Sequence, residues 1–232
     1  GDVYKRQLLR EQSHSRITFG DSTLCFNNNF DFFLSEIEKV FPKEKDRFQD
    51  LLKKMESFPA YSVRAEEISG RKILEEQIND PLLREMLLCP TCYYGSARQN
   101  DIDFPTFVML FDAIFKQGLA RPEKGIRAIL DPLVKKLKEH GVERKMNAPV
   151  FRMKANNGRI IEIELESGNC FTADQFISTC GGVETENLLG LPEHLKETEQ
   201  GKFTIIESMS VFKGHPREFG WEETVIFFNR SN

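Results

Sequence analysis

The sequence predicts a mixed α/β fold, and two observations support that class. Apolar residues recur at helical spacing through most of the first half, whereas the second half contains several short β-rich segments separated by turn residues. The 232 residues are 40% hydrophobic and 29% charged, which is an ordinary globular composition. This composition allows a sizeable core, in one large domain or two small ones.

The first half is predicted to be mostly helical. Pro42 ends one helix because proline cannot continue a helix, and Asp80 followed by Pro81 is typical of a helix N-terminus. A more apolar helix stops before Gly118. In order, the predicted elements are strands at 16–19 and 24–26 and helices at 30–40, 45–55, from 81 onward, and 104–115.

The second half is predicted to be a helix followed by strands. Gly141 stops the helix, and Pro132 inside it predicts a kink or a restart at Asp131. Asn157 and Gly158 form the turn of a predicted hairpin. In order, these elements are a helix at 126–137 and strands at 142–145, 150–154, 159–165, 175–178 and 203–212.

Phenylalanine is unusually frequent, with 20 residues against one Trp and four Tyr. Aromatic side chains mostly serve packing, so a Phe-rich core is the favoured interpretation. A pocket for an apolar ligand is the alternative.

Charge and targeting signals exclude several classes of protein. The net charge is −4 and the isoelectric point about 5.7, which gives no basic surface for nucleic acid. The sequence has no secretory signal and no apolar run near the roughly 20 residues that cross a bilayer. We therefore expect a cytoplasmic protein, with peripheral membrane association as an alternative. The five cysteines are not expected to form a disulfide framework.

Cys89 and Cys92 form a C-x-x-C motif, which can belong to a zinc site or a redox pair. A zinc site needs a second ligand pair, and the sequence offers none at suitable spacing. A reactive pair normally opens a helix, whereas this one is predicted to follow one. We therefore favour a structural role, with redox or metal use as alternatives, and we expect no metal site.

The sequence lacks the motifs of several other enzyme classes. It has no Gly-x-Ser-x-Gly elbow and no Walker loop. No two glycines stand in G-x-G spacing, so a dinucleotide-binding loop is missing as well. The residues by themselves indicate no catalytic acid or base.

A longer pattern carries a family resemblance. GLARPEKGIRAI at 118–129 leads into the predicted helix, and NAPVFRM at 147–153 and ADQFIST at 173–179 follow in order. With the segments 19–42 and 80–95, this series resembles the phytoene desaturase, carotenoid isomerase and flavin amine oxidase superfamily. The resemblance extends over residues 16 to about 228. It departs from the family where Lys124 stands in place of the first of two glycines, and where Cys180 follows the last motif.

The resemblance implies part of a two-domain FAD-dependent oxidoreductase. Residues 1–7 look like a non-native tag, and the other expected regions are a substrate-domain part at 8–119, a part of the FAD-binding domain at 120–185, and a return to the substrate-domain sheet at 186–232. By the same resemblance, the backbone of Val150 contacts the FAD adenine, and Ser178, Thr179 and Cys180 lie near the cofactor phosphates. For Val150, the alternative is an ordinary core position.

The implied activity is that of a desaturase or isomerase acting on an apolar, isoprenoid or polyene, small molecule. A flavin amine oxidase-like enzyme is one alternative, and a non-enzymatic binding relative that keeps the fold is another. Since no glycine-rich loop is present, this chain by itself is expected to be inactive and to hold no flavin. The oligomeric state is not indicated.

Overall fold

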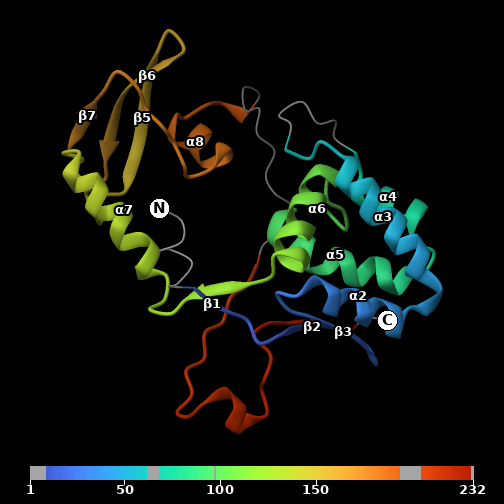
Figure 1. Ribbon diagram of the computed structural model, residues 1–232. Coiled ribbons are helices and arrows are strands. Elements are labelled where there is room, and N and C mark those ends of the chain that lie inside the picture. Colours follow the sequence, from blue (N-terminus) through green and yellow to red (C-terminus); the bar gives the residue numbers. More distant parts are fainter. Residues whose placement is uncertain (1–8, 62–67, 97, 194–204, 231–232) are drawn as a thin grey trace. The chain divides into compact units, whose positions relative to one another are not determined.

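The computed structural model describes residues 9–61, 68–96, 98–193 and 205–230 (Figure 1). Residues 1–7, which resemble a tag, lie outside this range. The chain divides into two compact units, the first made of Gly1–Asp131 with Lys202–Asn232 and the second of Pro132–Gly201. Both units mix helices and strands, which confirms the predicted α/β class.

The first unit contains five strands and five α-helices among its described residues. Its strands are β1 (Leu9–Glu11), β2 (Ser15–Phe19), β3 (Ser22–Phe26), β4 (Ala120–Pro122) and β8 (Ile226–Asn229). Its helices are α2 (Phe30–Val40), α3 (Lys45–Ser57), α4 (Gly70–Gln77), α5 (Pro81–Gly95) and α6 (Phe104–Phe111), with a π-helical extension at Asp112–Lys116 and 3-10 turns at Pro42–Glu44 and Pro216–Phe219.

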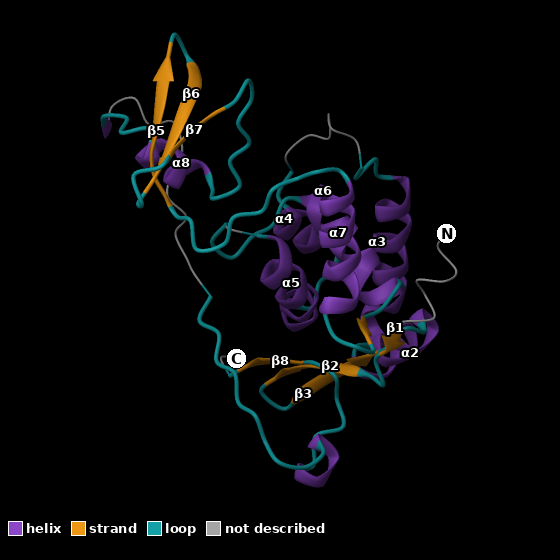
Figure 2. Cartoon of the chain, turned by 90° about the vertical axis from the view of Figure 1, so that its left-hand side faces the viewer, coloured by secondary structure: helices purple, strands orange, loops and turns teal. Residues whose placement is uncertain are grey.

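The main sheet of the first unit joins segments from the two ends of the described chain (Figure 2). Its strand order is β3-β2-β8, with β2 antiparallel to β3 and parallel to β8. Ile17 of β2 lies opposite Phe227 of β8, and both are buried. The strands β1 and β4 form a separate antiparallel pair in which Arg10 lies opposite Arg121.

Phenylalanine rings fill the core of the first unit, which confirms the prediction of a Phe-rich core. Phe33 stacks on Phe115 with ring centroids 4.5 Å apart, and both side chains are fully buried. Phe26 contacts Phe115 edge-on at 5.1 Å and stacks with Phe227 at 6.4 Å, so the rings join helices to the sheet.

Local capping explains where the predicted helices begin. The Asp80 side chain accepts hydrogen bonds from the backbone N–H groups of Leu82 and Leu83, as expected of an N-cap. The buried stripe of α3 is also confirmed. The helix α4 was not predicted, although Ser69 caps it by accepting from the N–H of Lys72.

The second unit contains β5 (Val150–Asn156), β6 (Arg159–Leu165), β7 (Cys170–Thr172) and α8 (Gly182–Leu188). The sheet order is β5-β6-β7, and both pairs are antiparallel. The predicted hairpin turn is confirmed, since Asn157 and Gly158 have φ of 49° and 75°. These are the positive φ values that a tight turn of this kind needs.

Three predicted strands are wrong. Residues 142–145 and 175–178 form no strand, and neither do residues 205–212 of the segment predicted at 203–212. Residues 203–204 lie outside the described part of the chain. A segment of high β propensity forms a strand only where its backbone can hydrogen-bond to a neighbouring strand. In this chain β8 occupies the place beside β2.

The helix α7 (Arg127–Glu139) crosses the boundary between the two units. It continues through Pro132, so the predicted restart at Asp131 is wrong. One missing backbone hydrogen bond does not end the helix here. Its apolar side chains Ile129, Leu130 and Leu133 are exposed.

Candidate functional site

The second unit holds all four residues that the resemblance assigns to the cofactor. Val150 begins β5 and pairs with Leu165 at the end of β6, next to an irregularity in register before Arg152. Val150 is half-buried, whereas Leu165 is 8% exposed. The N–H of Glu166 donates to the carbonyl of Pro149 at 3.0 Å, which ties the entry of β5 to the end of β6.

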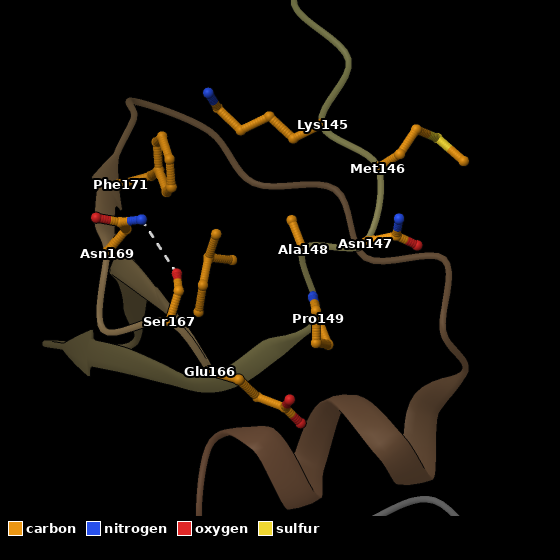
Figure 3. A pocket seen from close by; sticks show the side chains of 10 residues that line it. Lys145, Met146, Asn147, Ala148, Pro149, Glu166, Ser167, Asn169 and Phe171 are labelled. Atoms are coloured by element: carbon orange, nitrogen blue, oxygen red, sulfur yellow. Dashed lines mark hydrogen bonds between the residues drawn. The ribbon is translucent and has the colours of Figure 1, made fainter.

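A cavity of about 590 Å³ lies at this end of the hairpin. Figure 3 shows residues 145–149 lining one side and Glu166, Ser167, Asn169 and Phe171 lining the other. The Lys145 ammonium lies 5.3 Å from the centre of the Phe171 ring, and the Asn169 amide donates to the Ser167 hydroxyl at 3.1 Å. The cavity therefore combines an aromatic face with amide and hydroxyl groups, and Val150 directly follows it in sequence.

Ser178, Thr179 and Cys180 lie on the exposed segment that leads into α8. The Ser178 hydroxyl lies 3.2 Å from the Cys180 sulfur and 2.7 Å from the Thr185 hydroxyl, which also donates to the carbonyl of Gly181. The hydrogen-bonding contacts with Ser178, and then with Thr185, lower the pKa of the Cys180 thiol. These groups form a small hydroxyl and thiol cluster on the surface.

Thr185 is a member of this cluster that the sequence argument missed. The available signal was a hydroxyl residue in the first turn of a helix that begins at the Gly181-Gly182 pair. The helix α8 contacts β5, so the cluster and Val150 belong to the same compact unit. The structure gives them no direct hydrogen bond among the described residues.

The C-x-x-C pair lies in the first unit, inside the last turns of α5. The prediction that it follows the helix is therefore wrong, because α5 continues through Pro90 to Gly95. Both thiols are half-buried and reduced, and they line a cavity of about 420 Å³. Groups of three or more metal-ligating side chains are absent from the described residues.

Burial controls the acidity of these two thiols. Desolvation raises the pKa of Cys89, and it raises the pKa of Cys92 to about 11. The guanidinium of Arg71 acts in the opposite direction on Cys92, but burial outweighs it. Arg71 reaches this place from α4, where it forms a two-pronged ion pair with Glu85. Neither thiol is activated, which agrees with the structural interpretation.

The residues present fit one end of an FAD molecule better than its middle. An aromatic, amide-lined cavity beside a strand edge suits a nucleoside, since such groups hold a planar base. A pyrophosphate needs glycines at a strand-to-helix turn, and no two glycines of this sequence have that spacing. Gly181 is the N-cap, and Gly182 the first residue, of a helix of only seven residues.

Comparison with known proteins places this geometry in context. No family model matches the sequence. The 4,4'-diaponeurosporene oxygenases of Staphylococcus aureus strains USA300 and NCTC 8325 are each 31% identical over 120 residues. That match covers 51% of this chain and 24% of the relative, so it spans about a quarter of the relative's length.

A solved structure supports the fold. An oxidoreductase from Methanosarcina mazei superposes on 78% of this chain and 43% of its own, with a TM-score of 0.55 and 17% identity. No helix among the described residues is long and apolar enough to cross a membrane. The sequence match to a 4,4'-diaponeurosporene oxygenase supports the resemblance to the desaturase/oxidase-like superfamily that the ordered motifs indicate, and the solved structure shows that the fold is one found in an oxidoreductase.

Proposed function

We propose that this chain is part of an FAD-dependent oxidoreductase of the desaturase or isomerase type, acting on an apolar isoprenoid or polyene substrate. The observation that carries the proposal is the 31% identity over 120 residues to an enzyme named for a carotenoid, 4,4'-diaponeurosporene. The match to an oxidoreductase fold supports it. A bound flavin would supply the electron-accepting chemistry, while the protein positions the substrate.

Within this proposal, the second unit is part of the FAD-binding domain. Its cavity takes the adenosine end of the cofactor, with the backbone of Val150 beside it. The hydroxyls of Ser178 and Thr179 and the thiol of Cys180 face the phosphates. The hydrogen-bonded cluster around Ser178 supports this role, since hydroxyls are donors that phosphate oxygens accept.

The first unit is, in the same proposal, part of the substrate domain. Its Phe-rich core and its sheet, completed by β8, support a rigid scaffold against which an apolar molecule is held. We name no catalytic acid or base, because in this class the redox step belongs to the cofactor.

The first experiment compares flavin binding by this chain with flavin binding by a longer parent protein. The 232-residue chain, purified alone, is expected to be colourless, because a pyrophosphate loop is missing from its sequence. A longer parent protein that contains both this chain and a glycine-rich loop should carry a flavin absorbing at roughly 450 nm. A parent that purifies without flavin contradicts the proposal.

The second experiment tests the substrate and the site in that parent. Anaerobic incubation with a polyene should reduce the flavin and yield a more oxidised polyene by chromatography. Release of ammonia from an amine would instead favour an amine oxidase-like enzyme. A parent that retains flavin but shows neither activity would favour a non-enzymatic binding relative. Ser178→Ala should weaken flavin retention several-fold, as expected for one lost hydrogen bond to a charged group. The exposed Ser57→Ala is the matched control.

A further inference from the structure

The helix α7 carries an apolar stripe that is exposed in the described part of the chain. All residues of α7 are described and none of them is buried, whereas the helices α2 to α6 each bury apolar side chains. Leu133, near the centre of the stripe, is 56% exposed. Regular exposed apolar surface of this kind indicates an interaction site. The stripe consists of Ile129, Leu130, Leu133, Val134 and Leu137.

Charged side chains are arranged in order around this stripe. At about 100° of rotation per residue, Arg127 and Lys138 lie along one border of the stripe and Lys136 along the other. The acidic residues Asp131 and Glu139 lie on the far side of the helix. Positive charge therefore borders the stripe on both sides, and negative charge points away from it.

Positive charge is also in excess in the surrounding segment. Residues 121–145 contain eight lysines and arginines against four acidic residues, although the whole chain has a net charge of −4. Three of those four acids already form ion pairs, with Arg10, Lys135 and Lys145. The three basic residues at the borders of the stripe form no ion pair among the described residues, so their charges can attract an anionic partner.

This arrangement is typical of helices that lie in the surface of a lipid bilayer. Such a helix buries its apolar face among the acyl chains, while lysine and arginine at the borders of that face reach the headgroup phosphates. A stripe made to pack on another apolar protein surface gains nothing from positive charge along both of its borders. The combination of stripe and borders therefore favours an anionic bilayer over a neutral protein surface.

We propose that α7 binds an anionic lipid bilayer and lies flat on its surface. The apolar stripe enters the acyl region, and Arg127, Lys136 and Lys138 contact the lipid phosphates. This inference is independent of the proposed function, because it involves neither a flavin nor a polyene. Where both hold, α7 brings the enzyme to the phase in which an apolar substrate dissolves.

Flotation of the 232-residue chain with lipid vesicles tests the proposal directly. One set of vesicles is phosphatidylcholine alone, and the other is equal parts of phosphatidylcholine and phosphatidylglycerol. Binding to the mixed vesicles should be at least about tenfold tighter, because each basic residue at the border gains from a negative surface. Added salt should weaken it by screening. Failure to bind the mixed vesicles, or equal binding to both sets, overturns the proposal.

Leu133→Gln tests the apolar stripe. The change keeps the approximate size of an exposed side chain and should weaken binding to the mixed vesicles by roughly five- to tenfold. The matched control is Leu9→Gln, because Leu9 is 41% exposed and belongs to β1. An equal loss in the two variants would remove α7 from the argument. Circular dichroism checks folding, and if Leu133→Gln does not fold, the charge variants decide.

Lys136→Glu combined with Lys138→Glu tests the basic borders. This double variant should lose the preference for the mixed vesicles, because the borders of the stripe then repel the lipid phosphates. Lys53→Glu combined with Lys54→Glu in α3 changes the net charge by the same amount and should keep most of the preference. A preference lost equally in both variants would show that net charge alone governs binding, against the proposal.

Hydrogen exchange separates a bilayer from a protein as the occupant of the stripe. The backbone amides of α7 should exchange more slowly when the mixed vesicles are present. If a second copy covers the stripe instead, the chain elutes as a dimer that Leu133→Gln dissociates. If the rest of a longer parent covers it, α7 of that parent is protected without vesicles. Either result overturns the proposal, whereas vesicle binding by a chain whose parent oxidises no polyene defeats only the proposed function.

Discussion

The two units of the chain are stabilised in different ways. In the first unit, 26 of the 27 buried apolar side chains of the described residues gather, among them seven fully buried phenylalanines. In the second unit, Leu165 is the single buried apolar side chain of the described residues. Apolar burial is the largest favourable term in folding, so most of the stability belongs to the first unit.

The second unit depends instead on turn chemistry and cross-strand pairs. The Arg152 guanidinium lies 2.6 Å from Glu164 across β5 and β6, and Lys154 pairs with Glu162 in the same way. Exposed pairs of this kind contribute only about 0.2–1 kcal/mol each. The comparison teaches that two units with similarly regular helices and strands can differ widely in their free energy of unfolding.

The largest expected effect is that of a core phenylalanine. Phe33→Ala removes a fully buried ring that stacks on Phe115 at 4.5 Å, and it should lower the free energy of unfolding by about 3–5 kcal/mol. Phe151→Ala in β5, where the ring is 61% exposed, should change it by less than about 0.5 kcal/mol. Urea denaturation followed by circular dichroism measures both. Similar losses would show that the contrast between the units is false.

The thiols provide a second contrast between the units. The pKa of Cys92 is raised to about 11 by burial, whereas hydrogen bonds lower the pKa of Cys180. Near neutral pH, the thiolate fraction of Cys180 therefore exceeds that of Cys92 by at least roughly 100-fold. A less basic thiolate is also a weaker nucleophile, so iodoacetamide should label Cys180 about tenfold faster or more. Mass spectrometry of the labelled peptides measures the ratio, and faster labelling of Cys92 would contradict it.

The raised pKa of Cys92 also predicts how the stability of the protein changes with pH. Because folding favours the neutral thiol of Cys92, its contribution is fully present below the ordinary thiol pKa of 9.0. That contribution is lost as pH rises from about 9 through the folded-state pKa of about 11. Stability should therefore fall over this alkaline interval, and Cys92→Ala should reduce the fall.

Sequence signals predicted the elements that local chemistry determines. The N-cap of Asp80, the stop at Pro42 and the turn at Asn157 and Gly158 each depend on neighbours in sequence, and the structure confirms them. The helix α4 escaped because it opens with Gly70 and is short and highly charged, which masks its periodicity. The strand predictions were wrong where the folded chain offers no neighbouring strand to pair with the segment.

The candidate sites were less predictable, because they depend on contacts between distant residues. The effect of Arg71 on Cys92 requires α4 and α5 to lie together. Val150, Ser178, Thr179 and Cys180 came from the family resemblance alone, and their contact with a cofactor stays a prediction.

The smallest expected effect, an unchanged turnover, concerns the role of the C-x-x-C pair. Replacing Cys89 and Cys92 together by Ser places two hydroxyls in half-buried positions of α5, where the thiols behave as small apolar groups. The double variant should lose about 1–3 kcal/mol of stability, whereas the exposed Cys180→Ser should lose almost none. In the flavin-containing parent, the double variant should keep its turnover, since neither thiol is activated. A variant that folds and retains flavin but loses turnover would make the pair a redox relay. One equivalent of zinc, lost on changing either cysteine, would make it a metal site instead.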